Sequence, residues 1–249
     1  MSKKIQSSNI KKNHHRFLVN PDNIQKDFFI TKDKELINQI KNVFRLGTSS
    51  QISFFDGLGN EYLVEILKIE KDLIQGKILS KKKMAKNRFK IGLFCSLLKG
   101  DHFETVLEKC TELGISFFQP VIFDRTIIRE IKTGKLERYR KIIKEAAEQS
   151  GRSDLPDIFD PVDLMEAVKK TKNYFNLVSA IGAGKNILDI KFRNKDINIF
   201  IGPEGDFSEK EKELMKKEGF LFFNLGDNIL RSETACILAS GIILQNMLK

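Results

Sequence analysis

The chain has 249 residues, of which 41% are hydrophobic and 31% are charged. This length and composition exclude a wholly disordered chain and allow one large domain or a small domain joined to a medium one. Lys and Arg number 43 against 33 Asp and Glu, which gives a formal net charge of +10. A charge of this sign attracts polyanions, and nucleic acid is the commonest of these, although a general abundance of lysine gives the same balance.

The cysteines and histidines are few and scattered. They form no C-x-x-C pair and no histidine cluster, so we expect neither a disulfide framework nor a metal site. The N-terminal stretch is polar and basic, and no apolar run reaches membrane-spanning length, so we expect a cytoplasmic protein with no membrane contact. The residues concerned are Cys95, Cys110, Cys236, His14, His15 and His102.

The N-terminal third has a β-type pattern. We expect a disordered basic tail over residues 1–13, then a small β-barrel over 14–80 with one helix over 34–45. Turn residues at 56–60 separate two of its strands. The lysine-rich segment 81–90 predicts a linker, whose charge fits a solvated surface and an RNA-facing strip equally well. The expected strands are 17–19, 28–30, 51–55, 62–69 and 73–79.

Strands and helices alternate from residue 91 to residue 249. This order predicts an α/β domain with a mostly parallel sheet and helices on both faces. Ser208 and Glu211 form a capping box for one helix, and Ser232 is placed to cap the last. The expected strands are 91–98, 116–123, 173–180, 197–201 and 221–225, and the expected helices are 101–114, 135–149, 162–170, 208–219 and 232–248.

Two loops, 201–207 and 225–235, follow strands of this sheet, at the end where parallel sheets bind ligands. Gly202 and Gly205 would let the backbone approach a ligand closely, and Pro203 would stiffen the turn. Neither loop is a G-x-x-x-x-G-K-[ST] loop, and no G-x-G-x-x-G follows the first strand, which disfavours nucleotidases, NAD enzymes and Rossmann-type methyltransferases. The alternative is that both loops are only tight strand-to-helix connections.

Six ordered segments carry a family resemblance. With their spacing, they resemble the RsmE family, bacterial 16S rRNA uracil-N3-methyltransferases of the SPOUT superfamily. The resemblance extends from about Arg16 to the C-terminus. The segments are LKGD (98–101), EKCTELG (108–114), DRT (124–126), EAAEQSGR (145–152), IGPEGDF (201–207) and LGDNILRSETA (225–235).

The resemblance implies a PUA-like β-barrel followed by a SPOUT domain whose C-terminal chain forms a deep trefoil knot. It implies S-adenosyl-L-methionine as cofactor, a homodimer, and N3 of a specific uridine of 16S rRNA as target, within the assembled small ribosomal subunit. The chain departs from the family's pattern at residues 38–39, 49–50, 179–182, 206 and 227–228.

Site residues also follow from the resemblance. Arg231 would stabilise the uracil anion or anchor a phosphate, and Glu204 or Glu233 would accept the N3 proton. Glu233 could instead complement the helix dipole, and Arg231 could belong to a structural ion pair. The cofactor-binding residues would be Val178, Ile201, Gly202, Pro203, Glu204, Gly205, Leu225, Gly226, Ile229, Leu230, Arg231, Thr234 and Ala235.

Four arginines are candidates for binding RNA: Arg16, Arg125, Arg129 and Arg152. Arg125, Arg129 and Arg152 could equally be ion-pair partners at the surface. Two other functions remain open from the sequence alone. One is a SPOUT methyltransferase that acts on another RNA, and the other is a non-catalytic RNA-binding protein that kept the fold. Binding and turnover of S-adenosylmethionine would separate the enzymes from the binding module.

Overall fold

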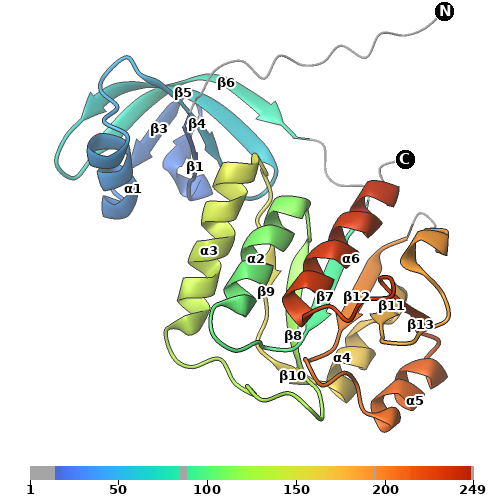
Figure 1. Cartoon of the computed structure of the whole chain (residues 1–249). Coiled ribbons are helices and arrows are strands. Elements are labelled where there is room, and N and C mark those ends of the chain that lie inside the picture. Colours follow the sequence, from blue (N-terminus) through green and yellow to red (C-terminus); the bar gives the residue numbers. More distant parts are fainter. Residues whose placement is uncertain (1–14, 85–88, 193–194, 248–249) are drawn as a thin grey trace, which may run out of the picture. The chain divides into compact units, whose positions relative to one another are not determined.

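A computed structural model describes residues 15–84, 89–192 and 195–247, which divide after Met84 into two compact units (Figure 1). The tail predicted over residues 1–13 lies outside the described residues. Within the described part, no helix is long and apolar enough to cross a membrane.

The N-terminal unit is built on one six-stranded sheet. Its strand order is β1-β4-β5-β6-β3-β2, with β1 parallel to β4 and the other neighbours antiparallel. A buried cluster that includes Phe17, Phe29 and Phe54 packs with helix α1 (Lys34–Asn38). The strands are β1 (Arg16–Leu18), β2 (Ile24–Gln25), β3 (Phe28–Thr31), β4 (Gln51–Phe55), β5 (Asn60–Ile69) and β6 (Ile74–Lys83).

Asp56 organises the turn between β4 and β5. Its Oδ1 accepts hydrogen bonds from the backbone N–H groups of Leu58 at 2.9 Å and Asn60 at 3.0 Å. Its Oδ2 accepts from Asn60 Nδ2 at 2.6 Å and from the Tyr62 hydroxyl at 3.4 Å. Burial raises the pKa of this carboxyl, but these donors outweigh burial and the net shift is downward.

Two predictions for this unit need correction. Residues 81–83, assigned to the linker, are the end of β6, because they pair with residues 60–62 of β5. The single helix predicted over 34–45 is a short α-helix followed by a π-helical turn, Gln39–Val43. Arg45 then ends the turn with φ +53. The apolar spacing of the sequence does not reveal this change of helix type.

The C-terminal unit is an α/β domain with an all-parallel sheet of order β10-β8-β7-β12-β11-β13, with β9 beside β8. This confirms the predicted α/β class. The strands are β7 (Ile91–Cys95), β8 (Phe117–Ile122), β9 (Asp157–Ile158), β10 (Val162–Asp163), β11 (Phe175–Ser179), β12 (Ile197–Ile201) and β13 (Leu221–Phe223). The helices are α2 (His102–Leu113), α3 (Lys135–Ser150), α4 (Leu164–Lys170), α5 (Glu209–Lys217) and α6 (Ser232–Met247).

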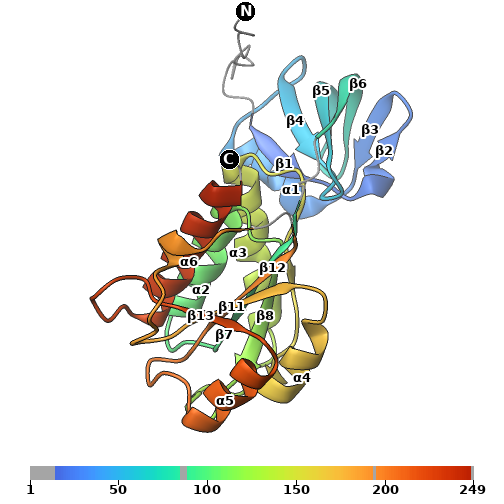
Figure 2. The same ribbon diagram turned by 90° about the vertical axis from the view of Figure 1, so that its right-hand side faces the viewer.

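Helices cover both faces of this sheet, with α2, α3 and α6 on one face and α4 and α5 on the other (Figures 1 and 2). Successive residues of a strand point to opposite faces. Leu93 and Leu177 therefore belong to the core under α2 and α6, whereas Phe94 and Val178 belong to the core under α4 and α5.

Local signals account for most of these helix and strand limits. The Ser208–Glu211 capping box is present at the start of α5, and β12 spans the residues predicted. The helix predicted over 162–170 begins only at Leu164, because Val162 and Asp163 pair with β8 as β10. Strand β9 and the 3-10 turn Ile187–Asp189 were not predicted.

Candidate functional site

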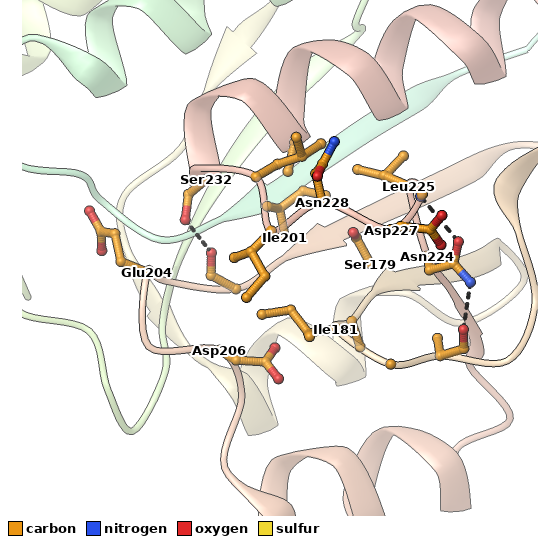
Figure 3. Close-up of a pocket in the computed structure, with 18 of the residues that line it drawn as sticks. Ser179, Ile181, Ile201, Glu204, Asp206, Asn224, Leu225, Asp227, Asn228 and Ser232 are labelled. Atoms are coloured by element: carbon orange, nitrogen blue, oxygen red, sulfur yellow. Dashed lines mark hydrogen bonds between the residues drawn. The ribbon is translucent and has the colours of Figure 1, made fainter.

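A pocket of about 530 Å³ opens at the carboxyl ends of β11, β12 and β13, where the sequence predicted a ligand site (Figure 3). Three loops, those after β11, β12 and β13, form its walls, and the first turn of α6 completes them. Its lining residues are Ser179, Ala180, Ile181, Gly182, Ala183, Ile201, Gly202, Pro203, Glu204, Asp206, Asn224, Leu225, Gly226, Asp227, Asn228, Ile229, Leu230, Ser232 and Ala235.

Hydrogen bonds fix these loops to one another (Figure 3). The Ser232 hydroxyl at the start of α6 donates to the Gly202 carbonyl at 2.9 Å, which joins the loops after β12 and β13. Asn224 Nδ2 donates to the Ala183 carbonyl at 2.6 Å, and Asn224 Oδ1 accepts from the Gly226 N–H at 3.1 Å. Asn224 therefore joins the loop after β11 to the loop after β13.

Two positions in the loops adopt left-handed backbone conformations. Gly226 has φ +114, a value that L side chains rarely adopt. Asp206, which stands where the family usually has glycine, has φ +58, and aspartate tolerates this region better than most residues. Asp206 also pairs with Lys212 at 2.9 Å, and its hydrogen bond raises the pKa of that lysine.

The pocket is acidic and apolar. Among the described residues, its lining includes Glu204, Asp206 and Asp227 and no lysine or arginine. Ile181, Leu225 and Leu230 supply apolar surface. Such a lining suits a ligand with a positive charge and a flat apolar part, and it disfavours a phosphate group.

Most of the predicted cofactor residues line this pocket, but four do not. Ser179 lines the pocket. Val178, one residue earlier in β11, points to the opposite face of the sheet from Ser179 and is buried in the core there. Gly205 lies under Arg125, whose Nη1 donates to its carbonyl. Arg231 and Thr234 are exposed and lie outside the lining.

The candidate catalytic side chains lie at the margin of the pocket. Glu204 is exposed, and its carboxylate points away from Ile181 and Ile201 (Figure 3). Glu233, between the lining residues of α6, faces His102 of α2 with 3.1 Å between Oε1 and Nδ1. This contact was not predicted, because it joins helices that are far apart in the sequence. Arg231 makes no side-chain hydrogen bond or ion pair with the described residues.

The four predicted RNA-binding arginines fall into two groups. Arg125 and Arg129 are exposed, and Arg129 Nη2 donates only to the Asp124 carbonyl at 3.2 Å. Arg152 is 8% exposed and donates to the carbonyls of Thr111 and Ile115 at 3.0 and 2.7 Å. The interpretation of Arg152 as an RNA contact therefore needs correction, since its guanidinium holds the end of α2.

Arg16 needs the same correction. Its side chain is 12% exposed, its Nε donates to Glu61 at 2.7 Å, and its guanidinium lies 4.2 Å from the centre of the Phe55 ring. These contacts join β1, β4 and β5. Arg16 is therefore an ion-pair partner within the fold, a role that the sequence did not indicate.

Sequence reasoning missed several lining residues. Ser179, Asn224 and Ser232 position the loops or line the pocket although they are not among the predicted cofactor residues. Asp206 and Asp227 lie within the two loops singled out from the sequence, so their positions were signalled but their roles were not. No group of His, Cys, Asp and Glu that could hold a metal occurs among the described residues.

The chain matches models of two known domain types. An RNA methyltransferase domain model matches residues 85–244, and an RNA methyltransferase PUA domain model matches residues 33–79. Fold, pocket and domain order thus define an RNA methyltransferase with a PUA domain. The chain belongs to the ribosomal RNA small subunit methyltransferase E family.

Individual relatives are similar in sequence to this chain over most of their length. The Borreliella burgdorferi ribosomal RNA small subunit methyltransferase E 2 is 32% identical, with 85% of this chain and 88% of the relative covered. The Bacillus subtilis methyltransferase E is 30% identical, with 84% and 87% covered. A crystal structure of the Neisseria gonorrhoeae methyltransferase E bound to S-adenosyl methionine is 29% identical, covers 94% of this chain and 98% of that one, and has a TM-score of 0.85.

Proposed function

We propose that this S-adenosylmethionine-dependent rRNA methyltransferase methylates N3 of a specific uridine in 16S rRNA of the small ribosomal subunit. The observation that carries the proposal is the pocket lined by residues 179–183, 201–204, 206, 224–230, 232 and 235. It contains the IGPEGDF and LGDNILRSETA segments that resemble the uracil-N3 family, and the similar Neisseria structure binds S-adenosyl methionine.

The residues present fit this cofactor. A sulfonium and an ammonium group carry positive charge, which the carboxylates of Asp206 and Asp227 would complement. Adenine needs apolar contacts on its faces, which Ile181, Ile201, Leu225 and Leu230 would supply, and backbone groups to bind its edge. The absence of lysine and arginine from the lining distinguishes this pocket from a nucleotide phosphate site.

The protein side of the reaction is positioning and charge stabilisation. Bound S-adenosylmethionine supplies an activated methyl group. Only the uracil anion is a good nucleophile at N3, so the protein must stabilise negative charge on the uracil oxygens and remove the N3 proton. Arg231, exposed beside the pocket and unpaired within the described chain, is the proposed cation.

Glu233 and Glu204 are the proposed proton acceptors. Glu233 is the better placed of the two, because it is largely buried and lies on α6 between Ser232 and Ala235, which both line the pocket. Its contact with His102 would orient the carboxylate and provide a second group that can hold a proton. Glu204 is the less well placed acceptor, because it is exposed and its carboxylate points outward.

Further features are proposed from the family. The N-terminal PUA unit would close as a barrel and position the RNA. Arg125 and Arg129 would contact the RNA beside the cofactor loops. The C-terminal chain would form a trefoil knot. A homodimer would pair α2 and α6, whose Leu113 and Leu238 are each 38% exposed. We also propose a cytoplasmic location.

The deciding experiment is methyl transfer from labelled S-adenosylmethionine to purified small ribosomal subunits that lack N3-methyluridine, followed by nucleoside mass analysis. Labelled N3-methyluridine is the expected product. A different methylated nucleoside would show that another RNA position is the target. Cofactor binding without transfer would mean that the RNA target is wrong, and a protein that binds no cofactor either would favour the non-catalytic RNA-binding alternative.

A further inference from the structure

A second pocket, of about 440 Å³, lies along the β13 edge of the parallel sheet. Its floor is apolar and is formed by Phe175 at the start of β11, Leu221 at the start of β13, and Ile190. Its other lining residues are Lys185, Asp189, Lys191 and Lys195. We call these seven residues the lysine pocket.

No contact within the described part of the chain accounts for the three lysines of this pocket. Lys185, Lys191 and Lys195 are exposed, and their side chains form no hydrogen bond or ion pair with any part of the chain that the structure describes. Only one carboxylate, that of Asp189, accompanies them in the lining. Three ammonium groups around one hollow repel one another, and an anion bound among them would relieve that repulsion.

The lysine pocket lies at the amino ends of β11 and β13, the cofactor pocket lies at their carboxyl ends, and the loop after β11 connects the two. Asn224, which lines the cofactor pocket, donates its backbone N–H to the Lys185 carbonyl at 2.8 Å and its Nδ2 to the Ala183 carbonyl at 2.6 Å. Ala183 and Lys185, one lining each pocket, are two residues apart and so are separated by at most roughly 7 Å along the backbone.

The two pockets differ in charge. Among the described residues, the lining of the cofactor pocket includes Glu204, Asp206 and Asp227 and no lysine or arginine, whereas the lining of the lysine pocket includes three lysines and one aspartate. A nucleic-acid strand that brings one base to the cofactor pocket must place neighbouring phosphates close by. The carboxylates repel those phosphates from the first pocket, and the lysines attract them to the second.

We propose that the lysine pocket binds a nucleotide of the substrate RNA that neighbours the methylated uridine. Its phosphate would contact Lys185, Lys191 and Lys195, while its base or sugar would lie on the floor of Phe175, Ile190 and Leu221. Such a contact fixes the register of the strand, because phosphate contacts position a nucleic acid without reading its sequence. The inference rests on the proposed function, since it takes the substrate RNA from it.

The test is filter binding of purified small ribosomal subunits lacking N3-methyluridine, measured over a salt series. The variant carries Lys185→Gln, Lys191→Gln and Lys195→Gln. The matched control carries Lys169→Gln, Lys210→Gln and Lys217→Gln, three exposed lysines of α4 and α5 outside both pockets. Both proteins lose the same charge, so a general effect of net charge acts on both equally.

For the pocket variant we expect affinity to fall on the order of tenfold to a hundredfold at about 0.1 M salt. We also expect the slope of log K against log salt to fall in magnitude by about 0.7, the value for one phosphate contact on a single strand. S-adenosylmethionine affinity, measured by calorimetry, stays unchanged in both proteins. Equal behaviour of variant and control would overturn the proposal.

Two further outcomes separate the inference from the proposed function. If wild-type protein binds uridine monophosphate and the pocket variant does not, while both bind subunits equally, the pocket serves a free nucleotide and the RNA assignment is wrong. If wild-type protein forms no N3-methyluridine but the pocket variant still binds RNA less tightly than the control, the proposed reaction fails while the lysine pocket stands.

Discussion

The two units of the chain use their polar groups in opposite ways. In the N-terminal unit, the polar side chains that attract attention in the sequence are satisfied internally: Arg16 pairs with Glu61, and Asp56 accepts four hydrogen bonds in its turn. In the C-terminal unit, the loops after three strands leave backbone groups and carboxylates around an open pocket. A polar side chain in the first unit therefore supports stability, whereas a loop position in the second supports binding.

The strongest test of this contrast is a glycine of the cofactor loops. Gly226→Val should weaken S-adenosylmethionine binding at least about a hundredfold, equivalent to about 2.8 kcal/mol, because valine cannot keep φ +114 and the pocket wall must move. Isothermal titration calorimetry measures the change. Gly219→Val is the matched control, since Gly219 has φ +77 in open space after α5. Equal weakening in both would refute a specific role for Gly226.

Arg231 tests the catalytic part of the site. Arg231→Gln should lower methyl transfer to small subunits on the order of a hundredfold, because a cation near the developing uracil anion is lost. The affinity of this variant for S-adenosylmethionine should stay unchanged, and its free energy of unfolding should change by less than about 0.5 kcal/mol. Arg140→Gln on α3, another exposed arginine outside the pocket, should leave transfer unchanged. A structural role for Arg231 would show instead as lost stability.

Asp56 tests the other side of the comparison. Asp56→Ala should destabilise the N-terminal unit by about 1 to 3 kcal/mol, because partly buried donors of the turn lose their acceptor. Urea denaturation measures this loss, and S-adenosylmethionine affinity should not change. Asp72→Ala, at an exposed turn between β5 and β6, provides the control. A loss of cofactor affinity in Asp56→Ala would break the separation between the units.

The smallest expected effect is the pH dependence that Asp56 contributes. Its pKa is lower in the folded protein than in the unfolded chain, so its stabilisation is complete above the unfolded pKa and decreases as the pH falls toward the folded pKa. Between about pH 5 and pH 2, the free energy of unfolding of wild-type protein should therefore fall more steeply than that of Asp56→Asn. Parallel pH profiles would show that Asp56 titrates alike in both states.

Prediction from the sequence succeeded where the signal is local. The apolar run of β12 and the Ser208–Glu211 capping box each depend on adjacent residues, and both are present in the structure. The glycine-containing loops could be located for the same reason, because each directly follows a strand. Val178 was predicted to bind the cofactor, but Ser179 lines the pocket instead. The face to which a strand residue points depends on a register that only the neighbouring strands fix.

Arginine roles could not be predicted, because they depend on distant partners. Arg16 and Glu61 are 45 residues apart, and Arg152 and the Thr111 carbonyl are 41 apart. A guanidinium buried against carbonyls and one exposed beside a loop look alike in a sequence. The contact between Glu233 and His102 was missed for the same reason, since it joins the starts of α2 and α6.

The position of β12 in the sheet has a consequence for biosynthesis. This strand lies between β7 and β11, and its first residue pairs with Ile91, which is made more than a hundred residues earlier. Residues of the cofactor pocket extend from Ser179 to Ala235, so all of them belong to the last third of the chain. A nascent chain that ends before β12 therefore has no complete pocket. Its strands β7 and β11 cannot pair with β12 until β12 has been synthesised. Ribosome-bound chains should acquire S-adenosylmethionine binding only once α6 has left the exit tunnel.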